Sequence, residues 1–372
     1  MVEVRVVVAA AVAVVAGGAG RKANQEKEGT MNSNLSSKSM TKFALVLVGL
    51  CCLTTVIALA QETPAAPTKP AAAIPPVGAK GFDSPQAAAE ALIQASADYS
   101  VTDMLAILGQ DGHDIVASSD QVGDKNNAVA FAKLAAAKKN VEISKTNPNR
   151  ATLIVGDADW PLPIPLVKVN GKWYFNAKEG RREILLRRIG ANELDAITVC
   201  RGYVEAQKEY AQTIHDDSGV NQYAQKIFST PGKQDGLYWK DPEGKPAGPI
   251  GEPVAKALEE GYTAGKTGFH GYYFKILKGQ GPSAPNGAIN YVIEGIMIGG
   301  FALVAVPVEY RVTGVKTFIV NYDGIVYQKD LGPDSLNIVK NMELYNPDKT
   351  WEATNDQWPP SVEDTATAES KP

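Results

Sequence analysis

The chain contains 372 residues, with 37 Lys and Arg against 41 Asp and Glu and a formal net charge of −4 at pH 7. This balance is mildly acidic with mixed signs, so nucleic acid is not an expected partner and no basic membrane-binding face is predicted. Two of the three cysteines, Cys51 and Cys52, lie in the apolar segment described next, which leaves Cys200 without a partner for an intrachain disulfide.

Residues 41–60 have the features of a secretory signal peptide. Lys42 precedes an apolar run that ends at Ala58, and Ala58 and Ala60 supply the small residues of an A-x-A cleavage site. The run is too short to favour a membrane span. We therefore predict cleavage after Ala60 and a periplasmic or secreted mature chain that has no membrane span.

The segments on either side of this signal peptide are not expected to join a core. Residues 1–40 contain Met31 and end at Met40, and translation from either would give a signal peptide of ordinary length, so we interpret 1–40 as an over-extended N-terminus. Residues 61–80 are rich in Pro, Ala and Thr and are predicted to be a flexible linker. The length of the remaining chain favours about two domains.

The first predicted domain spans residues 81–190 and begins with helices. Ser84 followed by Pro85 is typical of a helix N-terminus, and apolar residues continue from there at helical spacing. We predict a polar loop at 110–123 and a further helical segment around 128–135.

Strands follow these helices. The Asn170-Gly171 pair is a favoured two-residue hairpin turn between two apolar runs, so the sheet is expected to be antiparallel. Prolines at alternate positions from Pro161 to Pro165 lack the backbone N–H groups that would donate hydrogen bonds to a neighbouring strand. This predicts an edge strand or a bulged segment that leads into the sheet there. A basic helix from Glu179 to Ile189 completes an α+β domain. The predicted strands are 141–143, 151–155, 166–169 and 172–175.

The element order of residues 81–190 resembles that of nuclear transport factor two-like domains. In that cone-shaped fold, helices pack across a curved antiparallel sheet. The resemblance implies a fold and no activity, because such domains serve as enzymes, binding pockets or adaptors.

A second α+β domain is predicted at residues 191–350, followed by a polar tail at 351–372. Its first helix starts at Asn192 and places Cys200 at helical spacing with apolar neighbours, so we expect Cys200 to be buried. Only Gly190 and Ala191 separate this helix from the preceding one, so the two domains are expected to be closely coupled and to share a continuous or kinked helix. The predicted strands are 270–277, 290–293, 297–306, 315–320 and 325–328.

Several segments of this second half resemble, in order and spacing, the globular part of type IV pilin-like proteins. Pilins continue their first helix upstream into an apolar membrane-spanning segment, whereas this chain has Glu179-Gly180-Arg181-Arg182 there, so assembly into a pilus is not expected. The segments that carry the resemblance include Asn192-Glu193, Ala206-Gln207, Gly271-Tyr272-Tyr273-Phe274, Ala305-Val306-Pro307 and Thr317-Phe318-Ile319-Val320.

Residues 82–351 as a whole resemble a bacterial family of secreted proteins catalogued as domain of unknown function 2950. The resemblance implies no activity. It is carried by unusual segments in the right order, namely Phe82-Asp83-Ser84-Pro85, Asp159-Trp160-Pro161-Leu162-Pro163, Ser229-Thr230-Pro231-Gly232-Lys233, His270-Gly271-Tyr272-Tyr273 and Tyr327-Gln328-Lys329-Asp330.

Motifs with a defined chemistry are not met. Gly232-Lys233 is followed by Gln234 where a phosphate loop needs Ser or Thr. The three histidines, His113, His215 and His270, lack ligand spacing, so we predict no metal site and no cofactor.

The most informative segment for function is Ser229–Trp239, which combines turn-forming residues with charged and aromatic side chains. Loops held on a rigid scaffold are where binding groups concentrate. A second polar and aromatic group at His270–Tyr273 is expected to face it. The residues of this predicted groove are Lys233, Asp235, Tyr238, Trp239, His270 and Tyr272.

Three interpretations of these residues stay open: packing at a domain interface, a ligand groove, or catalysis with Asp235 and His270 as an acid–base pair. The sequence therefore favours a secreted or periplasmic, non-enzymatic interaction or envelope-associated module, with an envelope protein or a small ligand as its partner. A periplasmic hydrolase and a sugar- or peptide-binding module are the alternatives.

Overall fold

The computed structural model describes residues 74–117, 121–215, 219–251 and 268–355. The predicted over-extended N-terminus, the signal peptide and most of the linker lie outside these ranges. The fold combines helices with antiparallel sheets and is therefore α+β, as predicted. In the described ranges, no helix has the length and apolar character of a membrane span.

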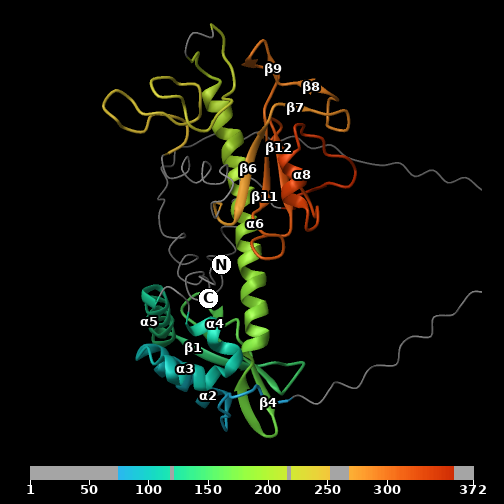
Figure 1. Cartoon of the computed structure of the whole chain (residues 1–372). Coiled ribbons are helices and arrows are strands. Elements are labelled where there is room, and N and C mark those ends of the chain that lie inside the picture. Colours follow the sequence, from blue (N-terminus) through green and yellow to red (C-terminus); the bar gives the residue numbers. More distant parts are fainter. Residues whose placement is uncertain (1–73, 118–120, 216–218, 252–267, 356–372) are drawn as a thin grey trace, which may run out of the picture.

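The N-terminal part packs short helices against a five-stranded antiparallel sheet (Figure 1). The strand order is β1-β2-β4-β5, and β3 pairs with β2. The helices are α2 (Pro85–Ala97), α3 (Val101–Leu108), the 3-10 turn η1 (Gln110–Gly112), α4 (His113–Val116) and α5 (Gln121–Ala137). The strands are β1 (Lys139–Ile143), β2 (Arg150–Val155), β3 (Trp160–Pro161), β4 (Leu166–Val169) and β5 (Lys172–Phe175).

Local sequence signals account for much of this part. The Ser84 hydroxyl accepts a hydrogen bond from the Ala87 amide and caps α2, and Pro85 occupies its first turn. Asn170 and Gly171 have φ of 50° and 83°, as the tight turn between β4 and β5 requires. The polar loop predicted at 110–123 is wrong in part, because η1, α4 and the start of α5 lie there.

A single 34-residue helix, α6 (Ala177–Tyr210), runs from the N-terminal sheet to the C-terminal sheet (Figure 1). Of the two arrangements that the sequence left open across Gly190, a continuous or a kinked helix, the structure has the continuous one. A Cβ added at Gly190 would meet no atom of the described residues within 4 Å, so this glycine lies at an open position of the helix surface and does not mark a break.

The C-terminal sheet has the strand order β14-β13-β12-β11-β6 and lies between α6 and α8 (Figure 1). Its central strands β11 and β12 are buried at every position, as expected for strands covered on both faces. The strands of this sheet and its covering helix are β6 (Tyr272–Leu277), β11 (Ala302–Pro307), β12 (Thr317–Asn321), β13 (Tyr327–Lys329), α8 (Ser335–Lys340) and β14 (Glu352–Ala353). Two separate two-stranded sheets pair β7 (Gly279–Gln280) with β8 (Ile289–Asn290) and β9 (Val292–Ile293) with β10 (Ile296–Met297).

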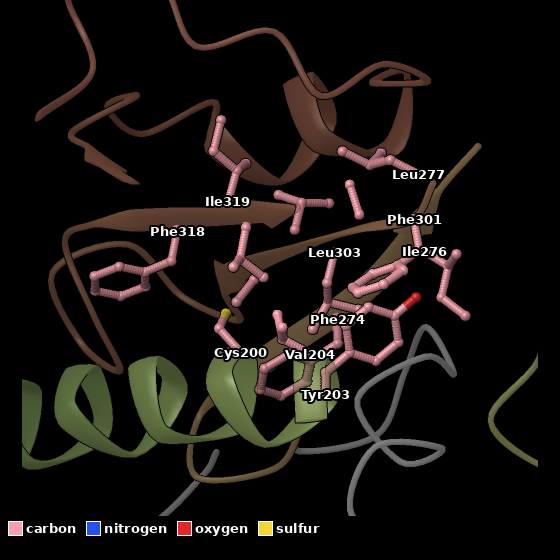
Figure 2. Packing of buried hydrophobic residues seen from close by; sticks show 14 of the residues in the cluster. Cys200, Tyr203, Val204, Phe274, Ile276, Leu277, Phe301, Leu303, Phe318 and Ile319 are labelled. Carbon is pink, nitrogen blue, oxygen red and sulfur yellow. The ribbon is translucent and has the colours of Figure 1, made fainter. Parts of the chain in front are cut away.

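Each of the two five-stranded sheets has its own cluster of buried apolar side chains, and α6 contributes to both clusters. Ala177 at the start of α6 belongs to the N-terminal cluster. Cys200, Tyr203 and Val204 point from α6 into the C-terminal cluster (Figure 2). Burial of Cys200, predicted from helical spacing, is confirmed, since the residue is fully buried.

The middle of α6 is tied to the loop before β12 by hydrogen bonds from side chains to backbone. Asn192 donates to the Thr313 carbonyl at 2.8 Å. A Glu193 carboxylate oxygen accepts from the amides of Val315 and Lys316 at 2.9 and 3.0 Å. These bonds fix the sheet against one side of the helix.

The folded part extends slightly beyond the predicted limits at both ends. The Gln110 amide donates to the Val77 carbonyl, and the Lys80 amide donates to the Ala106 carbonyl, so the end of the predicted linker is held on α3. At the other end, β14 pairs with β13 within the predicted polar tail. Short edge segments of this kind lack the apolar periodicity from which a strand or helix can be predicted.

Candidate functional site

Residues 228–247 line a surface groove with a volume of about 890 Å³, which we call the Trp239 groove. That volume falls within the usual range of ligand-binding sites. Its lining joins aromatic side chains to charged ones, including Lys233, Tyr238, Trp239, Lys240 and Asp241. Three of the six residues predicted for the groove therefore lie on it.

Asp235 organises the loop that forms one wall of this groove. Its carboxylate accepts hydrogen bonds from the Thr230 amide at 2.6 Å, the Thr230 hydroxyl at 2.8 Å and the Lys226 amine at 2.6 Å. Partial burial alone would raise the pKa of Asp235, but these bonds lower it to about 2. A carboxylate held so firmly in its ionised form is a poor proton acceptor at neutral pH.

Trp239 is positioned by two aromatic neighbours on α6 and the turn after it. The rings of Tyr210 and His215 are stacked with centroids 3.9 Å apart, and both meet Trp239 at steep angles. The Tyr210 hydroxyl donates to the Gln234 carbonyl at 2.5 Å, which attaches the groove loop to the end of α6. The indole is therefore held by a fixed support and stays partly exposed on the groove.

Tyr238 belongs mainly to the core beneath the groove. It is buried and packs edge-on against Phe228 with ring centroids 5.1 Å apart. Tyr272 does not reach the groove. It is fully buried, its hydroxyl donates to the Lys316 carbonyl at 2.8 Å, and burial raises the pKa of its phenol. The prediction that Tyr272 lines a binding groove is wrong, because alternation along β6 turns this side chain into the core.

His270 lies at a second pocket rather than at the Trp239 groove. Its Nδ1 forms a hydrogen bond with the Asp195 carboxylate. This bond raises the pKa of His270, because its effect is larger than the opposing effect of partial desolvation. Asp195 lies 15 positions before Tyr210 on α6, a separation of about 22 Å along the helix axis at 1.5 Å per residue. The structure thus keeps Asp235 and His270 apart, and the predicted acid–base pair is not formed.

The residues that sequence reasoning missed are Asp195, Tyr210 and His215. Asp195 and Tyr210 sit within the periodic pattern of a long helix, where nothing distinguishes a polar side chain at a pocket from one in solvent. The sequence pattern tests His215 only as a metal ligand, because its stacking on Tyr210 depends on the turn after α6. Within the described ranges, no group of three or more His, Cys, Asp or Glu side chains is placed to hold a metal ion.

Comparison with protein families gives one match. The family described as protein of unknown function (DUF2950) matches residues 79–354, which include both sheets, the Trp239 groove and His270. The chain belongs to this family. No curated protein and no solved structure matches the chain. The nuclear transport factor two-like and pilin-like folds therefore stay predictions.

Proposed function

We propose that this DUF2950 protein is an exported, non-enzymatic binding module whose Trp239 groove takes a ligand that carries carboxylate groups beside a ring or an apolar face. The observation that carries the proposal is the placement of Trp239, braced by Tyr210 and His215, next to Lys233 on one groove.

The aromatic wall favours a ligand with a flat or apolar surface. A tryptophan whose orientation is already fixed offers a large contact area and loses little conformational entropy on binding. The charged side chains of the lining are Lys233, Lys240 and Asp241, a positive balance that favours ligand carboxylates. Such carboxylates occur in acidic peptide segments and in acidic sugars, and a titration with each distinguishes the two sources.

The binding interpretation is favoured over the hydrolase interpretation by the state of the acidic groups. Asp235 is committed to Lys226 and Thr230 and has a pKa of about 2. The Asp241 carboxylate accepts a hydrogen bond from the Lys245 amide, which closes a turn. These two carboxylates thus have structural partners, which makes them poor candidates for a general base.

Calorimetric titration of the mature protein tests the proposal, with a glutamate- and tyrosine-rich peptide in one arm and an oligogalacturonate in the other. We expect one arm to give saturable binding that weakens with salt. Lys233→Ala should weaken it about fivefold, the effect of losing roughly 1 kcal/mol of charge attraction. Lys245→Ala is the matched control, because Lys245 is an exposed lysine of the same segment outside the groove lining.

Two results would contradict the proposal. One is the absence of saturable binding in both arms. The other is binding that Lys233→Ala and Trp239→Ala leave unchanged while circular dichroism shows that both variants are folded. Export is tested separately by N-terminal sequencing of the protein from the extracytoplasmic fraction, where we expect the first residue to be Gln61.

A further inference from the structure

The pocket beside His270 differs in chemistry from the Trp239 groove and lies at another level of α6. It has a volume of about 420 Å³, large enough for a small organic molecule. Its walls are mainly apolar and include Val199 from α6, together with Ile250 and Phe269. The hydrogen-bonded pair of Asp195 and His270 lies on the same pocket, so one site joins apolar walls to a pair of ionisable groups.

The hydrogen bond between Asp195 and His270 determines which atom of the imidazole is left for a ligand. Nδ1 is engaged by Asp195, so a ligand that hydrogen-bonds the ring would use Nε2. Asp195 also favours the imidazolium form, which the raised pKa of His270 reflects. In that form Nε2 carries a hydrogen and donates it, and a charge-assisted bond to a carboxylate is about twice as strong as a neutral one.

The backbone and ring of His270 are held in place independently of any ligand. The residue has φ of 45°, a region that non-glycine residues seldom occupy, and its ring stacks on Phe269 with centroids 4.1 Å apart. Residues held in such conformations are concentrated at functional sites. The imidazole is therefore presented at the pocket in one orientation.

Gly202 on α6 leaves room in the pocket. Among the described residues, a Cβ added at this position would meet no heavy atom within 4 Å. Glycine lowers the stability of a helix interior relative to alanine, so Gly202 has a cost in helix stability. The missing side chain keeps the surface of α6 open beside Val199 and Tyr203.

We propose that this pocket binds a small monocarboxylate with an aryl or acyl body, whose carboxylate meets Nε2 of His270 and whose apolar part packs against Val199, Ile250 and Phe269. This site is separate from the Trp239 groove, and the proposal does not depend on the function proposed for that groove.

Ligand-observed NMR and thermal shift measurements with the mature protein test this site. The probes are 3-phenylpropionate and hexanoate, each paired with the alcohol of the same chain. We expect saturable binding of a carboxylate and about tenfold weaker binding of its alcohol, the ratio that one charge-assisted hydrogen bond supports. Lys233→Ala should leave this binding unchanged.

Three variants locate the site. Gly202→Leu should abolish binding because the new side chain occupies the pocket. Gly190→Leu is the matched control, since Gly190 also lies on α6 in open space but outside the pocket lining. His270→Asn should weaken carboxylate binding about tenfold while leaving the alcohol unaffected, because asparagine tolerates positive φ and carries no charge.

The proposal is overturned by any of three results: no probe binds the wild-type protein, Gly202→Leu and Gly190→Leu behave alike, or the alcohols bind as well as the carboxylates. The melting temperatures of Gly202→Leu and Gly190→Leu are the folding control. If both equal the melting temperature of the wild type, a loss of binding is not caused by unfolding.

Discussion

His270 is hydrogen-bonded through Nδ1 to the carboxylate of Asp195 on α6. This pairing crosses 75 positions of the chain and attaches the start of β6 to the middle of the long helix. It also removes His270 from the reach of Asp235, so the two ionisable residues that the sequence grouped together act in different places.

The stability that the His270–Asp195 pair adds should depend on pH. Because the folded-state pKa of His270 is raised, the contribution is fully present below the unfolded value of about 6.5 and is lost as pH rises through the folded pKa. Urea unfolding of the wild type and of His270→Asn between pH 5 and 9 checks this. The wild type should be the more stable at pH 5, and the difference should shrink towards pH 9. A difference that is constant with pH would contradict the assignment.

Asp235 should contribute in the opposite direction. Its folded-state pKa is about 2, below the unfolded value of about 3.9, so its contribution is present above pH 4 and is lost as pH falls towards 2. Asp235→Asn should lower the free energy of unfolding at pH 7 by about 1 to 3 kcal/mol, since three donors lose a charged acceptor. Acid titration of both proteins by tryptophan fluorescence gives the test. If the variant and wild type lose stability identically between pH 4 and 2, the role assigned to Asp235 is wrong.

Cys200 should react slowly with thiol reagents in the native protein. Burial raises the pKa of its thiol to about 12, so the thiolate fraction at pH 8 is very small, and the side chain is enclosed between α6 and the sheet (Figure 2). Labelling with 5,5′-dithiobis-(2-nitrobenzoate) should be slow in buffer and fast in guanidinium chloride. Equal rates in the two conditions would contradict this expectation.

Two glycines of α6 should respond oppositely to the same substitution. Gly190→Ala should raise the free energy of unfolding by about 0.5 to 1 kcal/mol, because the new methyl group would clash with no atom of the part of the chain that the structure describes and a helix interior favours alanine. Gly180→Ala should lower it by about 1 to 3 kcal/mol, because the added Cβ would lie 2.8 Å from the Ile164 side chain and 3.1 Å from its Cα. Denaturant titration of both variants measures the difference. The same sign for both would show that the two glycines do not differ in packing.

The sequence alone determined the features that depend on neighbouring residues. Ser84 and Pro85 start a helix, and Asn170-Gly171 turns a hairpin, because a cap and a tight turn are satisfied within a few positions of the chain. Burial of Cys200 was predictable for the same reason, since helical spacing fixes which side chains share a face.

The tertiary structure decided what depends on contacts between distant segments. It made α6 continuous across Gly190, where the sequence left a continuous or a kinked helix open, and it packed the two ends of α6 against different sheets. It placed Tyr272 in the core, paired His270 with Asp195 and set Tyr210 and His215 behind Trp239. Composition and spacing identified residues able to bind a ligand, but which of them share a surface is set by the path of the backbone between them, and that path is fixed only when the helix and the sheet pack together.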